Sequence, residues 1–109
     1  MAEKPRGAPL EGDGTLTKTR TKGKLQAPGM WKVLLHNDDF TTQDFVVWLL
    51  KTVFHKPDPE AVQIMLSVHR EGKGTAGLYT RDMAETKVAQ ARHLAEAQEF
   101  PLLCTLEPE

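Results

Sequence analysis

The segment Leu-His-Asn-Asp-Asp-Phe-Thr (35–41) decides the fold, because it joins two stretches of different periodicity. Before it, Trp31, Val33 and Leu35 alternate with other residues, which predicts a strand with one largely apolar face. After it, residues 43–54 repeat with a helical period. A strand therefore ends in three polar acceptors where a tight loop meets a helix. Asn and Asp are typical loop residues, so a plain turn is one interpretation and a binding site is the other.

The helix after this segment has a recognisable start and end. Thr41 is a good N-cap, and Asp44 stands three residues later in the capping-box position. Lys56-Pro57 ends the helical pattern, because a residue before proline avoids the helical region. The apolar positions between form a broad stripe, as expected for a helix that covers a core. They are Phe45, Val46, Leu49, Leu50, Val53 and Phe54.

A second helix is predicted over Asp58–Glu71, opened by Asp-Pro-Glu and closed by Gly72 with Gly74. Its expected buried face consists of Ala61, Ile64, Met65 and Val68. Residues 75–80 then read as a short strand.

A third helix carries small residues at helical spacing, suited to close packing against a sheet. They are Ala84, Val88, Ala91 and Ala95. Pro101 opens a last strand in which Leu102, Cys104 and Leu106 share one face. The order β-α-α-β-α-β predicts an α+β fold, with a small antiparallel sheet of about three strands packed with three helices.

Composition divides the chain of 109 residues into two parts. Residues 1–29 hold five Gly, three Pro and few large aliphatic side chains, which predicts a disordered extension. Residues 30–109 form the predicted folded domain. The extension carries a basic patch, which either touches an acidic surface or nucleic acid or is simply solvated. This patch consists of Lys18, Arg20, Lys22 and Lys24.

Charge, cysteine content and hydropathy argue against several classes of protein. The domain holds eight Lys and Arg against twelve Asp and Glu, which argues against a nucleic-acid binder, as does its lack of clustered aromatic platforms. The single cysteine, Cys104, excludes a disulfide within the chain and fits the reducing cytosol. No apolar run is long enough for a membrane span or a signal peptide. We therefore expect a cytoplasmic protein.

Several acceptors with few donors are predicted to form one site. Asn37, Asp38 and Asp39 end the first strand, and His69 lies on the second helix beside Val68. Taken singly, each has a structural explanation, since a histidine near a helix C-terminus often only stabilises the helix dipole. Together, they favour a cation with protons to donate, and a primary ammonium fits.

An apolar wall is expected beside these acceptors. It consists of Leu35, Thr41, Val46, Met65, Val68 and Leu102. An ammonium group next to an apolar side chain describes the first residue of a polypeptide, and capture of an N-terminal amine is a known mode of peptide binding.

Four motifs in order resemble the ClpS family, the bacterial adaptors of the N-end rule. They are WKVLLHNDDFT (31–41), MLSVH (65–69), AETKVA (84–89) and FPLLCTLE (100–107). The resemblance implies an adaptor without catalysis. It implies that the chain binds N-degron substrates whose first residue is Phe, Tyr, Trp or Leu. It also implies that these are handed to the ClpAP unfoldase-protease.

The resemblance also implies roles for single residues. Asn37, Asp38 or Asp39, and His69 would hold the α-amino group. Gln43 stands at the pocket lip, where the family more often has Met. Further residues would line the side-chain pocket. These are Leu35, Thr41, Met65, Val68 and Leu102.

The resemblance also implies that two more positions contact the N-terminal domain of the ClpA unfoldase, as the matching residues of family members do. They are Asp82 and Lys87, and the family usually has Glu at the first.

A metal-binding protein is the alternative. His36, Asp38, Asp39 and His69 are ligand types that a divalent metal accepts. Strand alternation disfavours this reading, because it places His36 on the face opposite Leu35. No pair of nucleophile and base stands out, so we expect neither an enzyme nor a cofactor.

Overall fold

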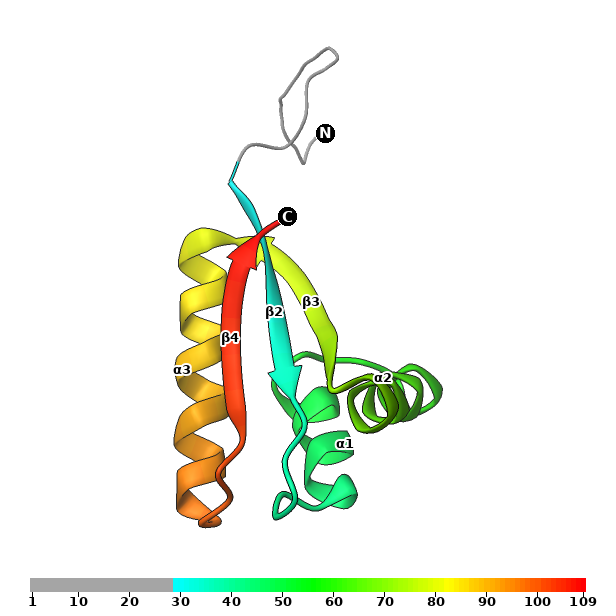
Figure 1. Cartoon of the computed structure of the whole chain (residues 1–109). Helices are drawn as coiled ribbons and strands as arrows, with labels where there is room; N and C mark the ends of the chain where they lie inside the picture. The colour runs from blue at the N-terminus through cyan, green and yellow to red at the C-terminus, as the bar shows by residue number, and fades with distance from the viewer. Residues whose placement is uncertain (1–28) are drawn as a thin grey trace, which may run out of the picture.

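The computed structural model describes residues 29–109 and contains six elements of secondary structure (Figure 1). The predicted extension therefore lies almost entirely outside the described residues. The α+β class and the order β-α-α-β-α-β are confirmed. The elements are β2 (Met30–His36), α1 (Gln43–Thr52), α2 (Asp58–Glu71), β3 (Lys73–Thr80), α3 (Arg81–Ala97) and β4 (Leu103–Pro108).

The three strands form an antiparallel sheet in the order β3-β2-β4, so β2 is central. Val33 pairs with Gly77 and Leu34 with Thr75, which leaves Ala76 as one extra residue in β3. The long helix α3 runs alongside the sheet, and α1 and α2 gather near the end of β2 (Figure 1). The turn that follows β2 thus lies beside both shorter helices.

The core lies between the sheet and the helices. The four small positions predicted to be buried on α3 are buried, and they allow the helix to approach the sheet closely. On α2, Ala61 and Val68 are buried, whereas Ile64 and Met65 only pack against the core from its margin. The largest fully buried side chains are Leu35, Leu49, Leu50 and Val33. Each buried leucine contributes about 1.5–3 kcal/mol to stability.

The helix α1 starts at Gln43 as predicted, but its N-cap differs from the prediction by one residue. Thr42, not Thr41, is the N-cap, and its hydroxyl accepts a hydrogen bond from the Phe45 N–H at 3.1 Å. Thr41 is unavailable because Asp38 accepts hydrogen bonds from its N–H and its hydroxyl. The helix ends at Thr52, two residues before the predicted end.

The bounds of α2 are those predicted, and Gly72 ends the helix in the left-handed conformation at φ 91°. Gly74 was expected to help close the helix, but it belongs to β3, which starts at Lys73 rather than 75. A Cβ atom at Gly74 would lie 2.9 Å from Val68 Cγ2. This glycine therefore lets β3 approach α2. The last strand also starts later than expected, at Leu103.

Within residues 29–109, none of the helices has the length and apolar character needed to cross a membrane.

Candidate functional site

The turn after β2 is shaped by the Asp38 carboxylate. Its Oδ1 accepts hydrogen bonds from the N–H of Phe40 at 2.8 Å and of Thr41 at 2.7 Å. Its Oδ2 accepts from the Thr41 hydroxyl at 2.7 Å. Burial acts to raise the pKa of Asp38, but these three hydrogen bonds outweigh it and hold the pKa below its ordinary value. Asp38 therefore organises the loop backbone.

The same turn is tied to the end of α2. The Asn37 N–H donates to the carbonyl of Gly72 at 2.8 Å, which continues the pairing of β2 with β3. The Gly72 N–H in turn donates to the Val68 carbonyl at 3.0 Å. Because His69 follows Val68 directly, the two regions that the sequence analysis singled out are held together by backbone hydrogen bonds.

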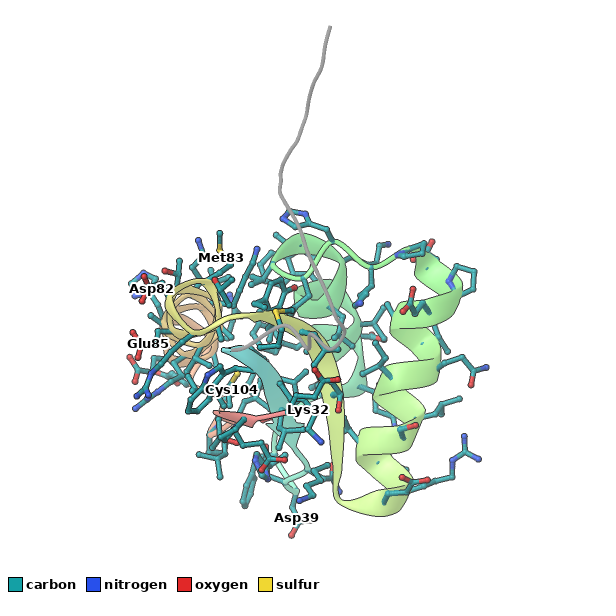
Figure 2. All side chains as sticks on the ribbon, turned by 90° about the horizontal axis from the view of Figure 1, so that it is seen from above. Lys32, Asp39, Asp82, Met83, Glu85 and Cys104 are labelled. Atoms are coloured by element: carbon teal, nitrogen blue, oxygen red, sulfur yellow. The ribbon has the colours of Figure 1, made fainter. Side chains whose placement is uncertain are left out.

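The other predicted acceptors, two in the turn and one on α2, face solvent. Asn37, Asp39 and His69 are all exposed. Asp39 projects from the edge of the molecule, away from α3 (Figure 2). Unlike the Asp38 carboxylate, which the loop itself uses, these side chains are accessible to a ligand.

The predicted apolar wall belongs to the main core. Leu35, Val46, Val68 and Leu102 are members of one buried cluster, and Met65 packs against that cluster while partly exposed. Thr41 is half-buried and Gln43 is exposed at the start of α1. Five of the six wall residues thus belong to the core or pack against it, and Thr41 lies in the turn.

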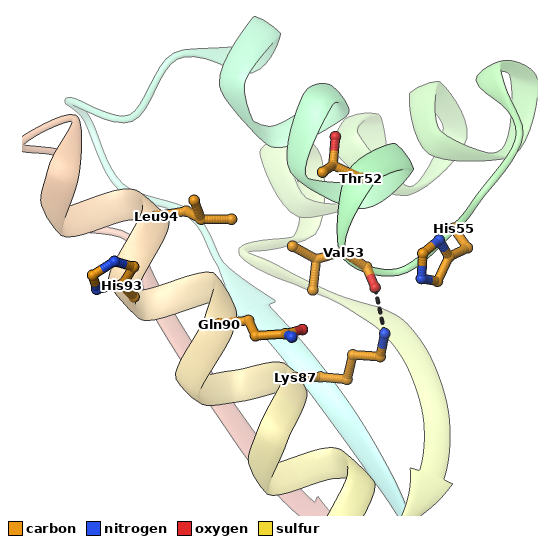
Figure 3. A pocket seen from close by; sticks show the side chains of 7 residues that line it. All are labelled: Thr52, Val53, His55, Lys87, Gln90, His93 and Leu94. Carbon is orange, nitrogen blue, oxygen red and sulfur yellow. Dashed lines mark hydrogen bonds between the residues drawn. The ribbon is translucent and has the colours of Figure 1, made fainter.

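Two surface cavities found among the described residues lie elsewhere. One lies between the end of α1 and α3 (Figure 3), and the other lies between α2 and the sheet face that carries Lys32 and Leu34. None of the predicted pocket residues lines either cavity.

The described residues do not bring together the four ligands named for the metal-binding alternative. His36 Nε2 is hydrogen-bonded to Thr105 Oγ1 at 2.8 Å, on the sheet face opposite Leu35. In the part of the chain from 29 to 109, no three His, Cys, Asp or Glu side chains are grouped so as to hold a metal ion. Strand alternation keeps His36 away from the turn.

The two predicted partner contacts occupy different environments on α3. Asp82 is exposed in the first turn and projects outward with Met83 and Glu85 (Figure 2). Lys87 is half-buried, and its Nζ donates to the Val53 carbonyl at 2.6 Å. Sequence reasoning missed this contact, because it joins residues 34 positions apart.

The thiol of Cys104 is buried against the core. Burial raises its pKa to about 12, although the nearby Arg92 acts in the opposite direction. The thiolate is the reactive form of cysteine, so Cys104 is a packing residue rather than a nucleophile.

The described residues form a small α+β domain in which an exposed, acceptor-rich turn is tied to the end of α2. Residues 26–105 match the family model of the ATP-dependent Clp protease adaptor protein ClpS. The chain is 53% identical to the ClpS adaptor of Desulfatibacillum aliphaticivorans over 91 residues, which covers 84% of this chain and 88% of that protein. It is 43% identical to the adaptor of Caulobacter vibrioides strain NA1000 over the full length of both.

A solved structure is also similar. Agrobacterium tumefaciens ClpS2 bound to L-phenylalaninamide shares 40% sequence identity and a TM-score of 0.73, covering 76% of this chain and all of that one. The chain belongs to the ClpS family of Clp protease adaptors. The resemblance stated from the sequence is confirmed.

Proposed function

We propose that this adaptor captures the first residue of N-degron substrates and delivers them to a ClpA-type AAA+ unfoldase in the cytoplasm. The observation that carries the proposal is the similarity to ClpS2 bound to L-phenylalaninamide. That ligand combines a free α-amine with a benzyl side chain, as does the first residue of a polypeptide that starts with Phe. The exposed acceptors and the apolar cluster of this chain match those two parts.

The amine is held by acceptors from both sides of the turn. Asn37 and Asp39 offer side-chain oxygens, and His69 offers a ring nitrogen from the end of α2. Asp38 makes the turn rigid, and its charge still attracts an ammonium group. Preorganised acceptors around a cation form charge-assisted hydrogen bonds, which are about twice as strong as neutral ones.

The side chain of the first residue enters the apolar wall. Leu35, Val46, Val68 and Leu102 are too well buried to move apart at low cost, whereas Met65 is half-exposed and unbranched. Methionine adapts readily to a new neighbour. We therefore infer that Met65 moves to admit Phe, Tyr, Trp or Leu. Thr41 and Gln43 form the rim.

Delivery requires a second surface and a segment that the unfoldase can grip. Asp82 and Lys87 are the proposed contacts with the N-terminal domain of the unfoldase. The predicted extension, residues 1–29, is the proposed grip. A protein that starts at Pro28, and so lacks residues 1–27, is then expected to bind Phe-peptides normally but not to promote their degradation by ClpAP. Full delivery by the shortened protein would contradict the role given to the extension.

A titration tests the capture of the first residue directly. A fluorescent peptide that begins with Phe is expected to bind saturably, as followed by anisotropy. The same peptide beginning with Asp is not expected to bind, because a carboxylate cannot enter an apolar wall without a large desolvation cost. Equal binding of both peptides would contradict the proposed function.

A further inference from the structure

Phe40 is the most exposed large hydrophobic side chain in the part of the chain that the structure describes. Its side chain is 75% exposed, whereas the other large hydrophobic side chains on that surface are 38–54% exposed. A single exposed apolar side chain is common on proteins and indicates nothing by itself. The position of Phe40 distinguishes it, because it follows the acceptor Asp39 and precedes Thr41 at the rim of the predicted pocket.

The backbone that carries the Phe40 ring is fixed on both sides. The Phe40 N–H donates to Asp38 Oδ1 at 2.8 Å, and the Thr41 N–H donates to the same oxygen at 2.7 Å. The ring itself is not among the side chains that form the core or pack against it. Because an aromatic side chain has only two rotatable angles, a ligand that covers this ring meets little entropy cost.

A substrate held by its α-amine must place its second residue close to this ring. Consecutive Cα atoms are about 3.8 Å apart, so the second residue of the substrate lies one residue length from the amine, just as Phe40 lies one residue length from Asp39. Successive side chains of an extended chain point to opposite sides. When the first side chain enters the apolar wall, the second therefore points away from that wall and toward the exposed surface of the turn.

We propose that Phe40 forms a second subsite, which contacts an apolar side chain at the second position of the substrate. The inference rests on the proposed function and extends it from one substrate residue to two. The exposed ring offers apolar surface that gains from being covered. The carboxylates of Asp38 and Asp39 beside it would repel an acidic second residue.

Two labelled peptides that differ only in the second residue test the proposal on the natural, full-length protein. One begins Phe-Leu and the other Phe-Asn. Leucine and asparagine have similar shapes and no charge, so the comparison responds to the ring rather than to the neighbouring carboxylates. We expect the Phe-Leu peptide to bind about fivefold more tightly, as followed by anisotropy. Equal affinities would overturn the second subsite.

Substitutions of Phe40 locate this preference on the protein. Phe40→Ser is expected to bind the Phe-Asn peptide like the natural protein and to lose the preference for Phe-Leu, whereas Phe40→Tyr keeps the ring and the preference. Leu78→Ser is the matched control, because Leu78 is 44% exposed on β3, where it pairs with Lys32. This variant is expected to keep the fivefold preference.

A change of charge gives a second readout at the same position. Phe40→Lys places a cation in the subsite, so it is expected to raise the affinity for a Phe-Glu peptide relative to a Phe-Gln peptide about threefold over the natural protein. A preference for Phe-Leu that survives in Phe40→Ser, or no change of the Glu-to-Gln ratio in Phe40→Lys, would overturn the proposal. If the natural protein binds none of these peptides, the proposed amine capture fails as well, whereas equal, saturable binding of Phe-Leu and Phe-Asn removes only the second subsite.

Discussion

The turn after β2 and the cavity between the end of α1 and α3 are each held by one charged side chain, and the two charges have opposite signs. In the turn, the Asp38 carboxylate accepts from backbone N–H groups, and Asn37 and Asp39 are exposed beside it. In the cavity, Lys87 donates to the backbone carbonyl of Val53. The proposed function assigns the turn to the substrate amine and Lys87 to the partner, so the two regions are expected to respond separately to substitution.

Acetylating the α-amine of the peptide is expected to cause the largest change in peptide affinity, and it tests whether the turn binds the amine. Acetylation removes the charge of the α-amine and two of its donors, and hydrogen bonds to a charged group are worth about 1.5–3 kcal/mol each. We therefore expect a loss of affinity of about a hundredfold or more. Anisotropy titrations with free and acetylated Phe-peptides measure it. Equal affinities would mean that the turn does not bind a cation.

Removing single acceptors is expected to have a smaller effect, confined to one region. Asn37→Ala and His69→Ala each remove one charge-assisted hydrogen bond, so peptide affinity is expected to fall about tenfold. Binding of the unfoldase is expected to stay the same. His93→Ala is the matched control, because it removes an exposed histidine from the cavity between α1 and α3. Weaker peptide binding by His93→Ala would show that the two regions are not independent.

Asp38→Ala tests whether the Asp38 carboxylate stabilises the turn, independently of ligand binding. The loss of three hydrogen bonds at a helix entrance is expected to lower the free energy of unfolding by about 1 kcal/mol. The pKa of Asp38 is lower in the folded protein than its ordinary value of 3.8. Its stabilisation is therefore complete above that ordinary value and is lost as the pH falls through the lower, folded value.

Urea titrations of the natural protein and of Asp38→Ala measure this dependence on pH. The difference in stability is expected to be full at about pH 6 and smaller at about pH 3. A difference that is the same at both values would mean that the charge of Asp38 does not hold the turn.

Local signals in the sequence predict much of this fold. The Asp-Pro-Glu start and Gly72 give both ends of α2, and the spacing of small residues gives the buried face of α3. The N-cap of α1 was misplaced because Thr41 and Thr42 are equally good caps. The choice between them depends on where the Asp38 carboxylate points, which the sequence pattern does not show.

The candidate site was also predicted only in part from the sequence. The motifs predicted that Asn37 and His69 belong to one site, whereas the backbone link between their segments, through the Gly72 carbonyl, required the pairing of β2 with β3. The hydrogen bond between Lys87 and Val53 could not be predicted, because the two residues are distant in sequence and meet only when α3 packs beside α1.

The smallest effect concerns the rim of the substrate pocket, where Gln43 stands exposed in the first turn of α1. Burying its amide without a partner costs about 1–3 kcal/mol, so Gln43 stays in water and leaves the rim open. Leucine, which is small and wholly apolar, then loses part of its burial energy, while the larger aromatic side chains reach deeper walls. We expect Phe-, Tyr- and Trp-initiated peptides to bind more tightly than Leu-initiated ones.

Gln43→Met tests this reasoning, because methionine has similar reach and closes over a leucine without burying a polar group. The ratio of Phe- to Leu-peptide affinity is expected to narrow about threefold, which corresponds to less than 1 kcal/mol of recovered burial. Gln63→Met on α2 is the matched control and is expected to leave the ratio unchanged. If the natural protein binds both peptides equally, or if Gln43→Met does not alter their ratio, selection among first residues is made by the deeper wall and by Met65 alone.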